Sequence, residues 1–280
     1  MTSFASRQWV REAMAAHGLA TRKRFGQHFL VDPFVLDKVI EGAGIESGDV
    51  VLEIGPGLGA LTQALAKKAG HVLAVEIDRT LARVLREVFA GEPVTVVEGD
   101  ILKTDLAELV RPYGHLRKKA VANLPYYITT PALFNLLEGN VKFDSITVMV
   151  QKEVANRMAA KPRTKDYGAL TLAVGFYADV SLIANVPVNC FMPRPAVDSA
   201  VVKLDVQSEP MVGADRDAFF RLVKAAFGKR RKTLANCLDG YGKSKAELEL
   251  LFESAGIGKN ARGEELDIHA FGRLAEALRK

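Results

Sequence analysis

The sequence predicts an α/β fold: a doubly wound, Rossmann-like sheet followed by a small all-helical domain. Over the first two thirds of the 280 residues, short apolar runs alternate with helix-length segments. This alternation is typical of parallel strands joined by crossover helices. Beyond residue 207 the strand pattern stops, and apolar side chains recur at helical spacing instead.

The strands and helices of the sheet follow one another in a regular order. A Pro-rich loop, not a helix, joins the last two strands, so one of them is expected to run antiparallel at that edge. The predicted strands are residues 50–54, 72–75, 94–97, 120–123, 146–150, 180–186 and 200–206, and the clearest helices are 60–68 and 79–89.

Three segments are predicted along the chain. Residues 1–20 form an N-terminal extension, either a short amphipathic helix around Trp9 and Val10 or a flexible segment. Residues 21–206 form the Rossmann-like domain. Residues 207–280 form the helical domain, which is too small for enzymatic machinery but suited to binding a partner.

Composition excludes several classes of protein. No apolar stretch is long enough to span a bilayer, and the N-terminus has no secretory h-region, so neither a membrane nor an export signal is expected. Cys190 and Cys237 lie far apart, and the five histidines are scattered, which predicts no disulfide scaffold and no metal centre. A reducing cytoplasm is the expected location, and without a long exposed apolar stripe we expect a monomer.

Positive charge is concentrated in four runs, at residues 22–24, 117–119, 161–165 and 229–232. The net charge is +5, which by itself favours nucleic acid only weakly. Clustered lysines and arginines bind phosphates, and a solvated surface is the alternative for any one run.

A glycine-rich turn marks a nucleotide-cofactor site. Residues 55–59, Gly-Pro-Gly-Leu-Gly, follow the first strand and open a helix, where free N–H groups face a ligand. Glu76 ends the next strand, where its carboxylate can accept hydrogen bonds from ribose hydroxyls. The pattern also fits the relaxed dinucleotide fingerprint, so NAD and S-adenosylmethionine both remain open. Asp100 ends the third strand and is expected either to accept from an adenine amine, to cap a helix, or both.

The tetrapeptide Asn123-Leu124-Pro125-Tyr126 follows the fourth strand and predicts the reacting site. The Asn123 oxygen and a backbone carbonyl near Pro125 can accept from an exocyclic –NH2 group and so turn its lone pair toward an electrophile. Tyr126 can stack on the base. A sulfonium methyl donor needs no strong base, because alignment supplies most of the acceleration. Phe191, in a proline-stiffened loop, is expected to face Tyr126 across the base or to pack in the core.

With these motifs in place, the sequence closely resembles the KsgA family, the small-subunit ribosomal RNA adenine N6,N6-dimethyltransferases. The matching segments span nearly the whole chain after Thr21. They are residues 22–30, 53–59, 76–78, 99–100, 123–126, 151–154, 191–195, 197–202 and 230–234.

This resemblance implies a class I S-adenosylmethionine-dependent methyltransferase sheet and a role for each matching residue. His28 stands where many relatives carry Asn, which leaves the cofactor contact of its side chain open. The implied cofactor-binding residues are Gln27, His28, Leu30, Gly55, Gly57, Glu76, Ile77, Asp100, Ile101 and Asn123. The implied catalytic residues are Asn123, Leu124, Pro125, Tyr126 and Phe191, and the implied RNA-binding residues are Arg22, Lys23, Arg24, Arg230, Arg231 and Lys232.

The resemblance also implies the substrate: two adjacent adenines in the 3′-terminal hairpin loop of 16S rRNA, methylated within the 30S subunit or its precursor late in biogenesis. Unpaired loop bases can be splayed into a pocket at low cost. One alternative is a 23S rRNA methyltransferase of the erythromycin-resistance type, although residues 22–30 and 230–234 favour the small-subunit type. A second is a non-catalytic nucleic-acid-binding factor on the same fold. An NAD oxidoreductase is disfavoured, because no hydride-site His or Lys adjoins Asn123.

Overall fold

The computed structural model describes residues 3–18, 27–229 and 232–279, and the chain folds into two compact units. The first unit comprises Met1–Ala155 and Ser181–Val206, and the second comprises Asn156–Val180 and Gln207–Lys280. The predicted boundary after residue 206 coincides with one of these junctions. Residues 156–180, however, belong to the second unit, which the strand-and-helix pattern did not predict.

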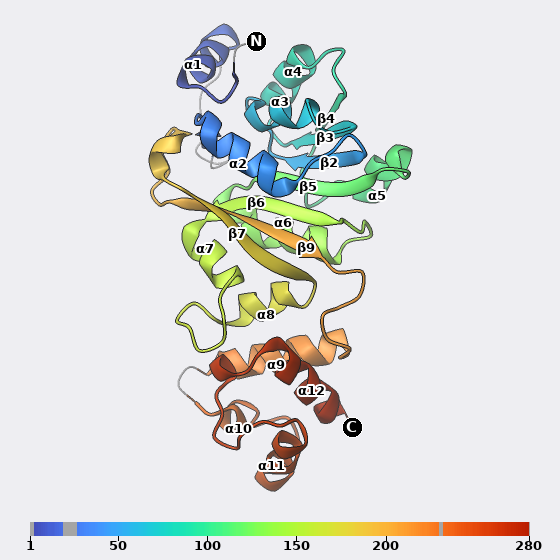
Figure 1. The fold of residues 1–280 in the computed structure, drawn as a ribbon, viewed down its shortest axis with the longest axis vertical. Coiled ribbons are helices and arrows are strands. Elements are labelled where there is room, and N and C mark those ends of the chain that lie inside the picture. The colour runs from blue at the N-terminus through green and yellow to red at the C-terminus, as the bar shows by residue number, and fades with distance from the viewer. Residues whose placement is uncertain (1–2, 19–26, 230–231, 280) are drawn as a thin grey trace. The chain divides into compact units, whose positions relative to one another are not determined.

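A seven-stranded sheet with the order β4-β3-β2-β5-β6-β9-β7 forms the centre of the first unit (Figure 1). The strands from β2 to β6 are parallel, and β9 runs antiparallel to β6, as predicted for this edge. The chain moves outward from β2 to β4 and then returns to β5 on the other side of β2. This reversal creates a crevice at the carboxyl ends of β2 and β5, where open α/β sheets bind ligands. The strands are β2 (Asp49–Ile54), β3 (His71–Glu76), β4 (Val94–Glu98), β5 (Arg117–Asn123), β6 (Ser145–Gln151), β7 (Ala178–Val186) and β9 (Ser199–Val206).

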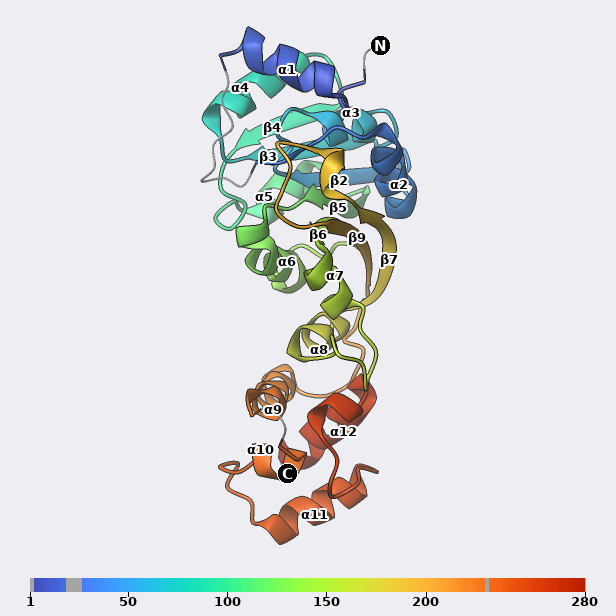
Figure 2. The ribbon, with the colours of Figure 1, turned by 90° about the vertical axis from the view of Figure 1, so that its left-hand side faces the viewer.

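Helices cover both faces of the sheet, with α2 and α3 on one face and α6 on the other (Figure 2). Val39 and Ile40 of α2 and Leu65 of α3 pack in one cluster with Val51 and Val121 of the sheet. Asp32 and Asp78 accept backbone N–H groups at the starts of α2 and α4, which fixes where these helices begin. The helices of this region are α1 (Arg7–Ala16), α2 (Pro33–Ala43), α3 (Ala60–Ala66), α4 (Arg79–Val88), α5 (Leu106–Val110), α6 (Thr129–Glu138) and α7 (Lys152–Met158).

A second, two-stranded sheet joins segments that are distant in the sequence. In it β1 (Phe29–Leu30) pairs antiparallel with β8 (Phe191–Met192), so that Leu30 lies opposite Phe191. The backbone N–H of Val31 extends the pairing by donating to the Cys190 carbonyl at 2.8 Å. This pairing carries residues 27–30 to the Phe191 loop.

Two residues of the basic run at 117–119, Arg117 and Lys119, have a structural role. The Lys119 ammonium lies 2.9 Å from one oxygen of the buried Asp49, and Arg117 lies 2.9 Å from the other. Lys119 also donates to the Gly44 carbonyl at 2.6 Å. These contacts neutralise a carboxylate that would otherwise be costly to bury at the start of β2.

The second unit is helical around an aromatic core. Phe176 and Phe219 lie 4.9 Å apart between ring centroids, and Phe271 packs against Phe219 at 6.4 Å. Phe176 and Leu172 come from residues 156–180, and their burial in this core explains why that segment belongs to the helical unit. The helices are α8 (Ala169–Gly175), α9 (Arg216–Gly228), α10 (Leu234–Cys237), α11 (Lys245–Ser254) and α12 (Ile268–Arg279). No helix within the described residues of the chain is long and apolar enough to cross a bilayer.

Candidate functional site

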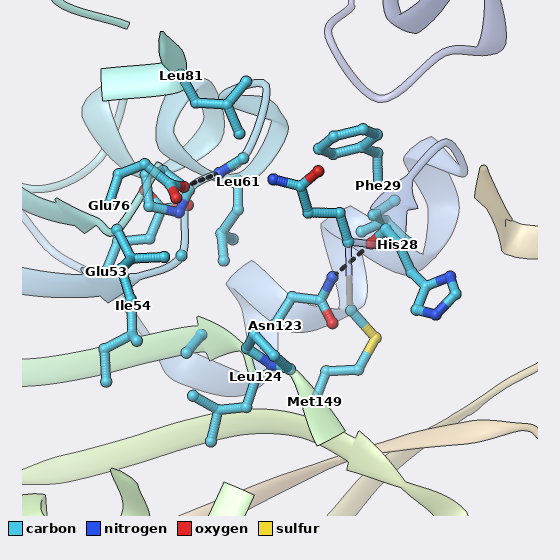
Figure 3. A pocket seen from close by; sticks show the side chains of 18 of the residues that line it. His28, Phe29, Glu53, Ile54, Leu61, Glu76, Leu81, Asn123, Leu124 and Met149 are labelled. Atoms are coloured by element: carbon cyan, nitrogen blue, oxygen red, sulfur yellow. Dashed lines mark hydrogen bonds between the residues drawn. The ribbon is translucent and has the colours of Figure 1, made fainter. Parts of the chain in front are cut away.

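A cavity of about 310 Å³ lies in the first unit at the carboxyl ends of β2 to β5 (Figure 3). All of the residues predicted for cofactor binding and catalysis line it. They are Gln27, His28, Leu30, Gly55, Gly57, Glu76, Ile77, Asp100, Ile101, Asn123, Leu124, Pro125, Tyr126 and Phe191. The parallel strands and the β1–β8 pairing bring these residues together from six separate segments.

The glycine turn after β2 lies directly against the cavity. Gly57 has a φ of 60°, and a Cβ atom there would lie 3.1 Å from the Phe29 ring. Its N–H donates to Glu76 Oε2 at 3.1 Å, which ties the turn to the end of β3. The turn therefore combines a left-handed backbone with a close approach of neighbouring groups, and both require glycine.

Glu76 is held rigidly at the end of β3. Its second oxygen, Oε1, accepts the Asp78 N–H at 2.8 Å, and the side chain is buried. Burial raises the pKa of this carboxyl to about 7. A carboxyl group fixed in this way at the cavity wall is suited to accept hydrogen bonds from a sugar diol.

Glu53 is a second buried carboxyl group in the cavity, and the sequence motif gave it no separate role. Burial raises its pKa to about 8, and the nearby Glu76 adds to the rise. Its Oε2 atom has no hydrogen-bond partner within the described residues. The available signal was an acid in the otherwise apolar run 50–54. A cation bound beside these two carboxyl groups would favour their ionised forms.

Apolar side chains that follow β3 and β4 line the cavity together with an acid. Asp100 Oδ1 accepts the Leu102 N–H at 3.0 Å, so the residue stabilises a turn and does not cap an α-helix. Ile77 and Leu102 line the same cavity and remain exposed, at 45% and 40%. A flat base can lie against such apolar side chains. Leu102 was not among the predicted residues.

Asn123 has a fixed orientation at the end of β5. Its Nδ2 donates to the His28 carbonyl at 3.0 Å (Figure 3). Because a carbonyl oxygen only accepts, this bond identifies the amide nitrogen and assigns Oδ1 as the acceptor of the side chain. The backbone beside it is also fixed, since the Leu124 N–H donates to the Met149 carbonyl at 3.1 Å.

Two aromatic residues belong to the wall near Asn123. The Tyr126 hydroxyl lies 2.8 Å from Ser199 Oγ, which fixes the outer end of its ring. Phe191 is 1% exposed and belongs to the core cluster, yet it also lines the cavity. The core packing expected of Phe191 is therefore observed, and its place opposite Tyr126 stays a prediction.

The His28 side chain points toward the Phe191 loop. Its Nδ1 lies 2.8 Å from the Pro193 carbonyl, so this nitrogen carries a proton. Figure 3 shows the ring turned away from Asn123 and Glu76, whereas the backbone carbonyl of His28 faces Asn123. In this orientation the imidazole contacts the Phe191 loop and forms part of the cavity wall.

Of the predicted RNA-binding residues, only Lys232 can be placed, and it is exposed in the second unit. Arg22, Lys23, Arg24, Arg230 and Arg231 lie outside the described residues. Within residues 3–18, 27–229 and 232–279, no group of three His, Cys, Asp or Glu side chains is arranged to hold a metal ion.

Residues 18–280 match the model of the family described as ribosomal RNA adenine dimethylase. A relative from Alkaliphilus oremlandii, named ribosomal RNA small subunit methyltransferase A, is 45% identical over all of this chain and 99% of its own length.

Two crystal structures share the fold. A dimethyladenosine transferase from Plasmodium falciparum aligns with a TM-score of 0.74 and 29% identity, over 88% of this chain and 95% of its own. The 23S rRNA methyltransferase ErmE aligns with a TM-score of 0.70 and 28% identity, over 90% and 99%. The backbone thus resembles a dimethyladenosine transferase and a 23S rRNA methyltransferase to a similar degree. The extent of the family match and the identity to the small-subunit relative show that the chain belongs to the ribosomal RNA adenine dimethylase family.

Proposed function

We propose that this protein transfers methyl groups from S-adenosylmethionine to the N6 atoms of two adjacent adenines in the 3′-terminal hairpin loop of 16S rRNA, within the 30S subunit or its precursor. The observation that carries the proposal is the fixed Asn123 amide, whose acceptor oxygen lies in the same cavity as the Glu76 carboxyl. Such a substrate implies a cytoplasmic location.

The residues of the cavity fit this cofactor. Gly57 provides the close backbone approach, Glu76 suits the ribose hydroxyls, and Asp100 with Ile77 suits the adenine. The Glu53 Oε2 atom, which has no hydrogen-bond partner within the described residues, leaves a polar atom in the cavity wall for a ligand. When bound, S-adenosylmethionine supplies an electrophilic methyl group on a sulfonium.

The protein side of the reaction is positioning. Asn123 Oδ1 accepts one N6 hydrogen of the adenine. The Pro125 carbonyl already accepts the Ile128 N–H at 3.1 Å, so we assign the second acceptor to the Leu124 carbonyl. Two acceptors in fixed places orient the nitrogen lone pair, while Tyr126 and Phe191 hold the base between aromatic faces.

Methylation of purified subunits distinguishes this proposal from the 23S type. We expect labelled S-adenosylmethionine to modify 30S particles lacking the dimethyladenosines and to leave 50S particles unlabelled. Mass mapping of the labelled RNA should place the methyl groups on the two hairpin-loop adenines. Labelling confined to 50S particles would contradict the substrate assignment.

A further inference from the structure

An N-terminal segment forms part of the cavity wall although the family match begins after it. The match starts at residue 18, whereas Phe4 and Val10 line the cavity. The sequence predicted here only an extension that was either helical or flexible. The structure contains a helix, α1, with Ser6 Oγ accepting the Trp9 N–H at its start.

Helix α1 packs its apolar face onto the cofactor end of the cavity. Val10 is 1% exposed, and it clusters with Ala13 of the same helix, Leu58 of the glycine turn and Leu81 of α4. Trp9 and Phe29 pack against this cluster. The helix therefore covers the turn that carries Gly57, next to Glu76.

Polar contacts attach the segment to both sides of the cavity. The Trp9 indole N–H donates to the Leu58 carbonyl at 3.2 Å, and the Phe4 N–H donates to Gln63 Oε1 at 3.1 Å. On the other side Arg7 donates to the Asn189 carbonyl at 2.7 Å, two residues before Phe191. The Phe4 ring stacks on Trp9 with centroids 3.9 Å apart.

We propose that residues 4–13 are a further part of the methyl-donor site: they close the cavity over the bound donor and slow the release of S-adenosylhomocysteine. This inference rests on the proposed function. Each methyl transfer consumes one donor, so dimethylation of two adenines requires repeated exchange through this cavity. An apolar wall that excludes water favours the bound state, and its contacts must loosen before the spent donor leaves.

The test compares Val10→Ala with Arg11→Ala. Val10 faces the cavity, and Arg11 is an exposed neighbour on the same helix. We expect Val10→Ala to release radiolabelled S-adenosylhomocysteine about fivefold to tenfold faster in a chase with unlabelled ligand, because it removes two buried methyl groups. Arg11→Ala should match the wild type.

A second variant, Phe4→Ala, and the fluorescence of Trp9 test the same inference independently. Phe4→Ala removes a wall residue that precedes α1 and should also speed release, even if Val10→Ala unwinds the helix. Trp9 is the only tryptophan of the chain, so its emission should change when S-adenosylhomocysteine binds. Unchanged emission together with equal release rates in all variants would overturn the inference and leave the proposed function intact. Failure of the wild type to bind S-adenosylmethionine would instead overturn the proposed function.

Discussion

The nitrogen and the oxygen of the Asn123 side-chain amide have different roles. Nδ2 holds the residue against the His28 carbonyl, and Oδ1 is the acceptor for the adenine amine. We predict that Asn123→Ala lowers kcat by about 10²–10³-fold, the usual cost of removing one polar group aimed at the reacting atoms. Binding to 30S particles should be unchanged, because the substitution removes no basic side chain.

Single-turnover methylation and a 30S binding assay measure the two effects separately. Asn140→Ala, an exposed Asn after α6, is the matched control and should keep full activity. Full activity of Asn123→Ala would place the reacting site elsewhere. Equal loss of activity and 30S binding would indicate a role in RNA recognition.

The buried carboxyl groups predict a pH dependence. The pKa values of Glu53 and Glu76, about 8 and about 7, lie above the ordinary value of 4.5, so folding favours their neutral forms. Their contribution to stability is fully present below the ordinary pKa and is lost as pH rises through about 7 to 8. As the pH rises from about 6 to about 9, the free energy of unfolding should fall less for Glu53→Gln than for the wild type.

Urea unfolding without ligand at a series of pH values measures this difference, with the exposed Glu41→Gln as control. A cationic ligand favours the ionised carboxylates, so the affinity for S-adenosylmethionine should rise over the same pH range. Parallel stability profiles for Glu53→Gln and the wild type would contradict the prediction.

Among the elements, the start of α3 depends on Gly59. This residue has a φ of 82°, and a Cβ atom there would lie 2.8 Å from the Phe89 ring and 3.1 Å from Leu85. We predict that Gly59→Ala lowers the free energy of unfolding by more than about 1 kcal/mol, from backbone strain plus this overlap. Gly48 is the matched control, since a Cβ atom there meets nothing within 4 Å and its φ is not positive.

Urea unfolding of Gly59→Ala and Gly48→Ala provides the comparison. If both variants lost the same free energy of unfolding, the contact with Phe89 would not be what requires glycine at residue 59. Weaker donor binding should accompany the loss at residue 59, because Gly59 and Gly57 belong to one turn.

The elements that the sequence predicted differ physically from those that it missed. All seven strands of the main sheet were predicted, and the signal is strongest for β2, β3 and β6, which each have a parallel neighbour inside the sheet and are almost continuous buried apolar runs. The two-residue strands β1 and β8 were missed, since a pairing that short has no periodicity of its own. The wall formed by Phe4 and Val10 was also missed: an amphipathic pattern predicts a helix but not the surface on which it packs.

At the scale of the whole molecule, the sequence pattern did not predict that residues 156–180 belong to the second unit. Leu172 and Phe176 precede β7, so chain order alone grouped them with the sheet domain. In the fold they pack in the core of the second unit, with Phe219 and Phe271. Contacts between residues this far apart in sequence depend on the tertiary structure.

This grouping predicts how a truncated chain behaves. A chain that ends after Val206 retains Leu172 and Phe176 but lacks Phe219 and Phe271, the partners that bury them. We expect it to bind a hydrophobic dye strongly and to aggregate, because buried apolar side chains become an exposed patch. Replacing both Leu172 and Phe176 with Ser in the truncated chain should reduce the dye binding. Dye fluorescence and light scattering of the two truncated chains measure the effect, and equal signals would mean that residues 156–180 do not depend on the helical unit for burial.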